Sequence, residues 1–462
     1  MVLEELDASG TRLTSEPTED ASNHHSTSRA IRLLKRLGTG PSRQPIVLAA
    51  CAVLQIPIWG FAMTYGIFQD YLVTHSTIRG SQSTLGVIGT TSNGVMYLSM
   101  PFLFGLLTRK WAHLRRRAAI TGAAIMCLSF LLSAFSTEVW HLIVTQGILA
   151  SIGSALIYSP TTLSLSENFS TNGRAVALGV TLSSKNITGS TFPFLLQYLL
   201  DHHGFRTTMQ VWAAISGALS LICILVMPMH APGMETRTNH RARKIPWDFL
   251  HHRTIWITAF ATMLQSSGYG LPQTYLSSYA SSVASLSVTS STLLITLFNA
   301  PGIISSSFFG FLSDNKTLPF SATSTAFMSS VSSALAVFFL WGFSSASSHS
   351  LVLLVLFSIV YGFFGGGYSA TWGGVMKDME KESADHNEAI DTGVVYGLLN
   401  GARGIGYVGG GLIGVQLLKA GDGHPLGKFG YGTSYGPLIL YTGLSTFLGG
   451  WAVFFKWRRL LH

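Results

Sequence analysis

Charged residues are scarce in this chain of 462 residues: only 11% are Asp, Glu, Lys or Arg, while 48% are hydrophobic. A soluble domain carries roughly 25% charged residues, so the composition excludes an ordinary soluble protein and indicates a polytopic membrane protein. Cysteine is scarce too, and Cys51, Cys127 and Cys223 each fall in an apolar segment, which excludes a disulfide framework and metal-ligand spacing. The chain also lacks paired carboxylates and a phosphate-cradling loop. We therefore expect neither an enzyme nor a cofactor.

Apolar runs of roughly 20 residues, the length that crosses a bilayer, recur along the chain. They predict an all-α membrane protein with twelve transmembrane helices, at residues 46–68, 85–107, 118–135, 139–163, 175–199, 205–229, 255–279, 291–312, 320–343, 351–376, 394–418 and 435–455. A basic loop at residues 231–252 is expected to join two pseudo-symmetric six-helix halves, at 45–230 and 253–456. Residues 1–44 and 457–462 are expected to be tails, the first of them disordered because it is polar.

The positions of the basic residues predict the orientation of these helices. If the amino terminus is cytosolic, 23 of the 29 Lys and Arg residues fall on the inner side and four on the outer side. Basic residues favour the cytosolic side of a membrane, so both termini are expected to be cytosolic. The net charge of +9 thus follows from topology, and no nucleic-acid partner is expected.

Two basic residues remain, and each stands in the middle of an apolar segment with no acid nearby. Lys185 lies ten residues into segment 175–199 and Arg403 nine residues into segment 394–418, about 14–15 Å deep at a helical rise of ~1.5 Å per residue. A charge at the bilayer centre costs roughly 2.5–3.5 kcal/mol, so it normally faces a cavity or a partner. We hypothesise that the partner is an anionic substrate. The alternative is a structural role, with each cation bonded to helix carbonyls.

Internal similarity supports the division into halves. Gly105-Leu-Leu-Thr-Arg109 follows the second segment and Gly310-Phe-Leu-Ser-Asp314 follows the eighth, while a glycine precedes both Lys185 and Arg403 by six residues. Repeats of this kind place a substrate site near the midplane, between the halves.

Residues 45–460 resemble the major facilitator superfamily, whose cytosolic loop signature is similar to the segment from Gly310 to Asp314. A finer resemblance is to its monocarboxylate porter branch, particularly the fungal members. The segments that carry this resemblance are Tyr65-Gly-Ile-Phe-Gln69, Gln146-Gly-Ile-Leu-Ala-Ser-Ile-Gly153, Tyr158-Ser-Pro160, Arg174-Ala-Val-Ala-Leu-Gly179, His203-Gly-Phe-Arg206 and Tyr361-Gly-Phe-Phe-Gly-Gly-Gly367.

Arg109 replaces the Asp of the superfamily's loop signature in the first half. The chain departs from the monocarboxylate porter branch at two further places, and at one of them the eighth segment offers Asn299 and Pro301 where animal members have Asp and Arg. The first segment ends in Gln69-Asp70 instead of supplying a Lys. Lactate-type chemistry therefore does not carry over, and a different substrate is expected.

The resemblance also indicates which helices line the central cavity, and their polar residues are weaker candidates for substrate contact. Such residues more often join helices, at about 0.6 kcal/mol per hydrogen bond. Asp70 is the only acid near the membrane interior and is the candidate for proton coupling; a substrate that carries its own proton and uncoupled transport are the alternatives. The weaker substrate candidates are Tyr65, Tyr158, Gln265, Tyr269, Asn299 and Tyr361.

The resemblance implies alternating access, in which the two halves rock about a central site. Together with the two cations it predicts a secondary active or facilitative transporter of a small organic anion, either a carboxylate or a carboxylate-bearing metabolite. The alternative is efflux of a largely neutral, hydrophobic specialised metabolite, with structural cations. A non-transporting sensor would need larger cytosolic segments than residues 1–44 and 231–252. We expect a monomer in the lipid bilayer of the plasma membrane, with protons as a second candidate partner.

Overall fold

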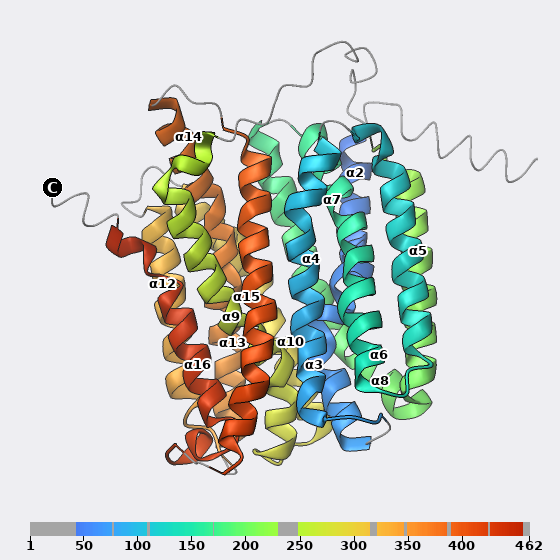
Figure 1. Ribbon diagram of the computed structural model, residues 1–462, viewed down its shortest axis with the longest axis vertical. Helices are drawn as coiled ribbons and strands as arrows, with labels where there is room; N and C mark the ends of the chain where they lie inside the picture. The colour runs from blue at the N-terminus through green and yellow to red at the C-terminus, as the bar shows by residue number, and fades with distance from the viewer. Residues whose placement is uncertain are drawn as a thin grey trace, which may run out of the picture.

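The computed structural model describes residues 43–75, 78–108, 111–169, 171–229, 248–314, 321–345, 349–385, 390–423 and 426–455. Nearly all of these residues are helical, and within them a bridge between Arg79 and Glu138 is the one isolated strand-like pairing. The helices run roughly parallel to one another and form two groups side by side (Figure 1). The first half of the sequence, blue to green, lies on one side, and the second half, yellow to red, on the other.

The first group begins with α2 (Arg43–Val53) and α3 (Gln55–His75), which continue one another. After the short 3-10 helix Gln82–Thr84 come α4 (Leu85–Thr108), the 3-10 helix Ala112–Leu114 and α5 (Arg115–Ser133). The next helix starts as α6 (Val139–Leu142) and passes through a π-helical stretch, Ile143–Leu149, into α7 (Ala150–Asn168). The last of the group is α8 (Thr171–Val226).

The length of α8 covers the fifth and sixth predicted segments, and the chain turns between them at Gly204. This residue has φ +74° and ψ 173°, a backbone conformation that glycine adopts without the penalty of a side chain. The predicted boundary between residues 199 and 205 therefore coincides with a break in the helix.

The second group contains α9 (Arg253–Ser282), α10 (Val288–Asn299), α11 (Gly302–Asp314) and α12 (Ala322–Leu335), which ends in a π-helical stretch, Ala336–Trp341. It continues with α13 (Ser350–Gly367), the 3-10 helix Tyr368–Thr371, α14 (Trp372–Asp385), α15 (Thr392–Gly421) and α16 (Gly436–Leu448), and further 3-10 turns lie at Asp248–His251 and Phe429–Gly432. One predicted segment, 291–312, is divided between α10 and α11 at Pro301, because proline has no N–H to donate to the helix.

Each of the twelve predicted segments coincides with a helix or with consecutive helices. Among the described residues, eight helical spans are long and apolar enough to cross a membrane, and one of these, Val176–Val226, holds two predicted segments. The helices α4, α9 and α15 are long enough, at 24, 30 and 30 residues, but are richer in glycine and hydroxyl residues. Residues 230–247 lie outside the described ranges, so the boundaries of the loop at 231–252, like those of the tails at 1–44 and 457–462, stay predictions.

The two groups meet where α4 packs against α15, a contact we call the α4–α15 seam. A Cβ atom added at Gly404 would lie 2.5 Å from the backbone nitrogen of Leu98 and 2.6 Å from the carbonyl oxygen of Gly94. Helix backbones approach this closely in membranes only where residues are small. The glycines of α15 therefore allow the two halves to pack closely at this seam.

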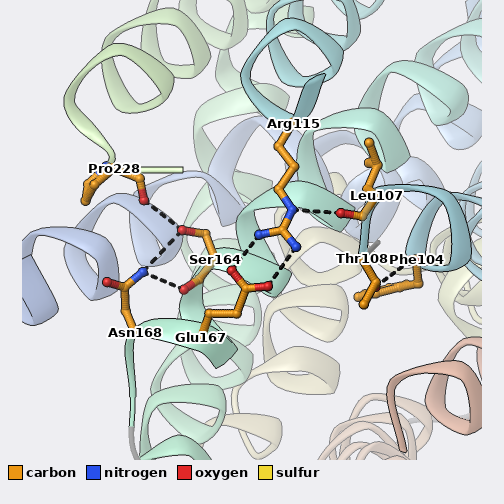
Figure 2. A network of polar contacts seen from close by, with 8 residues as sticks. All are labelled: Phe104, Leu107, Thr108, Arg115, Ser164, Glu167, Asn168 and Pro228. Atoms are coloured by element: carbon orange, nitrogen blue, oxygen red, sulfur yellow. Dashed lines mark hydrogen bonds and ion pairs between the residues drawn. The ribbon is translucent and has the colours of Figure 1, made fainter. Parts of the chain in front are cut away.

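One end of the first group is fastened by buried polar contacts (Figure 2). The Arg115 guanidinium is fully buried and donates to both carboxylate oxygens of Glu167, at 2.6 and 2.7 Å, while its Nε donates to the Leu107 carbonyl at 2.9 Å. Beside this ion pair, the Ser164 hydroxyl donates to the carbonyl of Pro228 at 2.8 Å. These bonds tie the ends of α4, α7 and α8 to the start of α5.

Candidate substrate site

Lys185 projects from α8 onto two aromatic side chains of the first half. Its Nζ donates to the Tyr97 hydroxyl at 3.2 Å and lies 3.9 Å from the ring centroid of Trp59. The side chain is partly buried. Within the described part of the chain, no carboxylate forms an ion pair with this ammonium, so the ring face of Trp59 is its main electrostatic support.

Arg403 projects from α15 into a second group of rings and is only 7% exposed. The centre of its guanidinium lies 4.8 Å from the Tyr97 ring and 5.8 Å from the rings of Tyr269, Trp372 and Tyr407. The Tyr407 side chain is also a close polar neighbour of this guanidinium. Its Nε is buried and has no hydrogen-bond partner among the described residues.

The two cations predicted from the sequence therefore meet at one residue, Tyr97 of α4. Lys185 contacts its hydroxyl and Arg403 contacts its ring. Lys185 belongs to the first group of helices and Arg403 to the second, and they lie within electrostatic range of each other. Two neighbouring cations repel each other, and an anion placed between them is attracted to both. This arrangement therefore favours the binding of an anion.

Six aromatic side chains, one from each of six helices, form a continuous row past the cations. Neighbouring ring centroids in this aromatic row lie 5.2–6.4 Å apart, inside the usual range for interacting aromatic pairs. The row crosses from the first half of the protein to the second at the pair Tyr97 and Tyr407. In order, its members are Tyr158 (α7), Trp59 (α3), Tyr97 (α4), Tyr407 (α15), Tyr269 (α9) and Tyr361 (α13).

Three of the weaker sequence candidates, Tyr158, Tyr269 and Tyr361, belong to this row. The Tyr158 side chain also lies close to that of Tyr396, which belongs to α15 in the other half. Tyr361 is fully buried, and its hydroxyl lies 3.5 Å from that of Thr446.

The other three weaker candidates have polar contacts elsewhere. The Tyr65 hydroxyl donates to the Leu85 carbonyl at 2.6 Å. The Asn299 amide donates to the carbonyl of Gly189 at 3.1 Å, across the two halves. Gln265 accepts from the Ser266 hydroxyl at 3.3 Å. The contacts of Tyr65 and Asn299 join different helices, whereas that of Gln265 stays within α9, and none of these contacts includes either cation.

Asp70 lies near the end of α3, where the two halves also touch. Its Oδ1 accepts a hydrogen bond from the Ser281 hydroxyl of α9 at 2.6 Å. Of the loop-signature residues, Gly105 and Gly310 have open space where a Cβ would stand. Arg109 and the side chain of Asp314 lie outside the described part of the structure.

Four members of the site were not anticipated: Trp59, Tyr97, Trp372 and Tyr407. Tyr407 follows Arg403 by four residues, a spacing that places both on one face of a helix. Its position beside Arg403 could therefore have been predicted from the sequence. The other three come from different helices, and only the packing of those helices brings them to the cations.

A comparison with known protein families identifies the family to which this chain belongs. The model of the Major Facilitator Superfamily matches residues 46–411. The chain belongs to the major facilitator superfamily. It is therefore a multi-pass membrane transporter and not an enzyme, as the sequence predicted.

Its relatives in this superfamily confirm the finer resemblance. The chain is 23% identical to the MFS-type transporter pynF of Aspergillus niger over 383 residues, 82% of each chain. It is 25% identical to the aspyridones efflux protein apdF of Emericella nidulans over 380 residues, 78% of this chain and 72% of that one. It is 28% identical to human monocarboxylate transporter 11 over 236 residues, about half of each chain. The crystal structure of the nucleoside transporter NupG shares the fold, with a TM-score of 0.61 and 17% identity over 88% of this chain and 97% of that one.

Proposed function

We propose that this transporter carries a small organic anion, a carboxylate or a carboxylate-bearing metabolite, and that Lys185 and Arg403 bind its negative end. In this proposal the six-helix halves, residues 45–230 and 253–456, rock about the α4–α15 seam and expose the site to each side in turn. The separation of the two groups of helices in Figure 1 supports such a division.

The observation that carries the proposal is an excess of hydrogen-bond donors at the two cations. Arg403 Nε has no partner among the described residues, and the indole N–H groups of Trp59 and Trp372 are in the same position. Indoles without a partner also occur away from the site, at Trp212 for example, so the guanidinium carries the argument. A carboxylate supplies the acceptors that this set needs, and a guanidinium can bind it through two parallel hydrogen bonds.

A purely structural role for the cations accounts less well for their contacts. A structural Lys or Arg in a membrane helix is expected to bond to backbone carbonyls or to an acid. Here Lys185 and Arg403 face aromatic rings and tyrosine hydroxyls instead. A desolvated cation–π contact contributes about 2 kcal/mol, enough to shelter a charge while leaving its donors available to a substrate.

The second candidate is export of a largely neutral hydrophobic metabolite. It is favoured by the similarity to apdF, which is described as an aspyridones efflux protein. The row of buried rings would suit such a cargo too. The two candidates differ in whether transport requires a carboxylate on the cargo.

The distribution of basic residues supports an orientation with both termini in the cytosol. We place the protein in the plasma membrane as a monomer. The proton-coupling role of Asp70 belongs to this proposal and is supported by its partly buried position at a contact between the halves.

The test is transport by the full-length protein in liposomes. Counterflow is measured for a panel of carboxylates and for their methyl esters, in wild type, in Lys185→Gln and in the control Lys419→Gln, whose lysine is exposed. Because a hydrogen bond to a charged group contributes about 1.5–3 kcal/mol, Lys185→Gln should weaken carboxylate transport roughly 10- to 150-fold. Lys419→Gln should match wild type.

Three results of this test have defined meanings. Lys185-dependent transport of carboxylates but not of esters supports the anion carrier. Transport of esters that is indifferent to Lys185→Gln supports the neutral-metabolite exporter. Carboxylate transport that Lys185→Gln leaves unchanged, in protein that is folded and inserted, removes the anion proposal.

A further inference from the structure

We propose that the anion bound at this site is flat and conjugated, with its negatively charged group attached to an aromatic ring or to a conjugated ring system. This inference rests on the proposed function, because it assumes that Lys185 and Arg403 bind the negative group. It adds that the aromatic row binds the rest of the molecule.

The length of the row is the first observation. Sheltering the cations accounts for the rings that contact them, which are Trp59 and Tyr97 at Lys185 and four rings at Arg403. The row continues beyond those rings at both ends. Tyr158 follows Trp59, and Tyr361 follows Tyr269, and neither terminal tyrosine makes a cation–π contact. Cation shelter therefore does not explain the two ends, although Tyr361 also packs against Phe298 and Phe357 of the second half.

The orientation of the rings is the second observation. The planes of Tyr97 and Tyr407 differ by 28° and those of Tyr269 and Tyr361 by 17°, so both pairs are close to parallel. Nearly parallel rings at these separations stack on one another with an offset, so the row is built of successive π-faces. A flat π-system can lie against such faces in an offset stack. A saturated ring of the same carbon skeleton is thicker and has no π-face.

The polar tips of the row are the third observation. The indole N–H of Trp59 is buried and has no partner among the described residues, and the Tyr97 hydroxyl already accepts from Lys185 and can donate its own proton. These donors lie beside the cations. They can donate hydrogen bonds to oxygen substituents on the ligand's ring near its charged group, as in a hydroxylated aromatic acid.

Matched pairs of acids test this inference. The probes are benzoate against cyclohexanecarboxylate and 2-naphthoate against decahydro-2-naphthoate, since each pair has one charge and one carbon skeleton. Binding to the purified full-length protein is measured by titration calorimetry. Wild type should bind the flat member of each pair about tenfold more tightly, which corresponds to about 1.4 kcal/mol.

Replacements at the end of the row separate stacking from charge. Tyr361→Leu should reduce the preference for the flat acid to about twofold, because it weakens the binding of the flat acid more than that of the saturated acid. Tyr361→Phe should keep the preference, because the ring remains. Tyr198→Leu, at an exposed tyrosine outside the row, is the matched control. If Tyr361→Leu fails to fold, Tyr158→Leu at the other end of the row, next to Trp59, serves the same purpose.

The outcomes distinguish this inference from the proposed function. Equal affinities within both pairs, with binding still lost in Lys185→Gln, would overturn the flat-anion inference and leave the anion carrier standing. A preference that survives the leucine replacements in folded protein would also overturn it. If none of the four acids shows Lys185-dependent binding, the proposed function falls and this inference falls with it.

Discussion

Replacing Glu167 with Gln should destabilise the protein by about 3 kcal/mol. The change keeps the shape of the side chain and removes the charge that balances Arg115, which is fully buried. Removing one partner of a buried ion pair costs about 3–5 kcal/mol because the remaining charge stays out of water. We expect the lower end of that range, since the Glu167 side chain is 24% exposed and Arg115 keeps its bond to the Leu107 carbonyl.

The loss can be measured by unfolding the purified protein in mild detergent while following tryptophan emission. A change of 3 kcal/mol corresponds to a more than 100-fold shift in the ratio of unfolded to folded protein. Asp201→Asn is the control, because Asp201 is exposed and its carboxylate accepts a hydrogen bond from Gln197, and surface changes usually stay within about 0.5 kcal/mol. Combining Arg115→Met with Glu167→Met should recover most of the lost stability, since apolar replacement of both partners is often neutral.

Two results would refute this reasoning. One is equal stability of Glu167→Gln and Asp201→Asn, which would mean that the ion pair contributes nothing at this end of the bundle. The other is a double variant that is less stable than Glu167→Gln alone, which would mean that the geometry and not the uncompensated charge is what matters. Substrate affinity of the folded variants should stay within about twofold of wild type, because the hydrogen bonds of this pair do not involve the aromatic row.

Other changes test the seam, the coupling candidate and the guanidinium. Gly404→Ala should cost about 1–3 kcal/mol of stability through overpacking against α4, whereas Gly409→Ala, with nothing within 4 Å, should match wild type in the same unfolding assay. Asp70→Asn should abolish stimulation of transport by an imposed pH gradient but preserve counterflow, while Ser281→Ala should retain the stimulation; an unchanged gradient response in Asp70→Asn would exclude this acid. Arg403→Lys should weaken substrate binding about tenfold, because lysine lacks the bidentate fork, and equal affinity would argue against bidentate binding.

Most of the fold was predictable because a bilayer demands long apolar segments. Even the turn at Gly204 fell between two predicted segments. The helix ends were less predictable: α7 runs to Asn168 and α14 to Asp385, past the predicted ends at 163 and 376. Polar residues can continue a helix beyond the hydrocarbon region, where hydropathy no longer marks its course.

The charged part of the site was predictable, whereas its aromatic part was not. Lys185 and Arg403 stand out because charges are rare in apolar segments. With 15 Tyr, 10 Trp and 28 Phe residues in the chain, no single ring stands out in the same way. Tyr97 can be assigned to the site only from the way α4 packs against α8 and α15. Conversely, Asn299 has a polar side chain that could bind a substrate, but its amide donates to the carbonyl of Gly189 on another helix.

The distribution of rings around the two cations has a consequence for biogenesis. Lys185 rests on Trp59 and Tyr97 of its own half, and Arg403 has Tyr269, Trp372 and Tyr407 of its own half around it. The first half thus carries the rings that shelter Lys185 before the second half has been synthesised. The second half brings three of the four rings around Arg403 with it, and the nearest, Tyr97, is supplied by the first half. Two separately translated fragments, divided between α8 and α9, could on this basis enter the membrane independently and reassemble there.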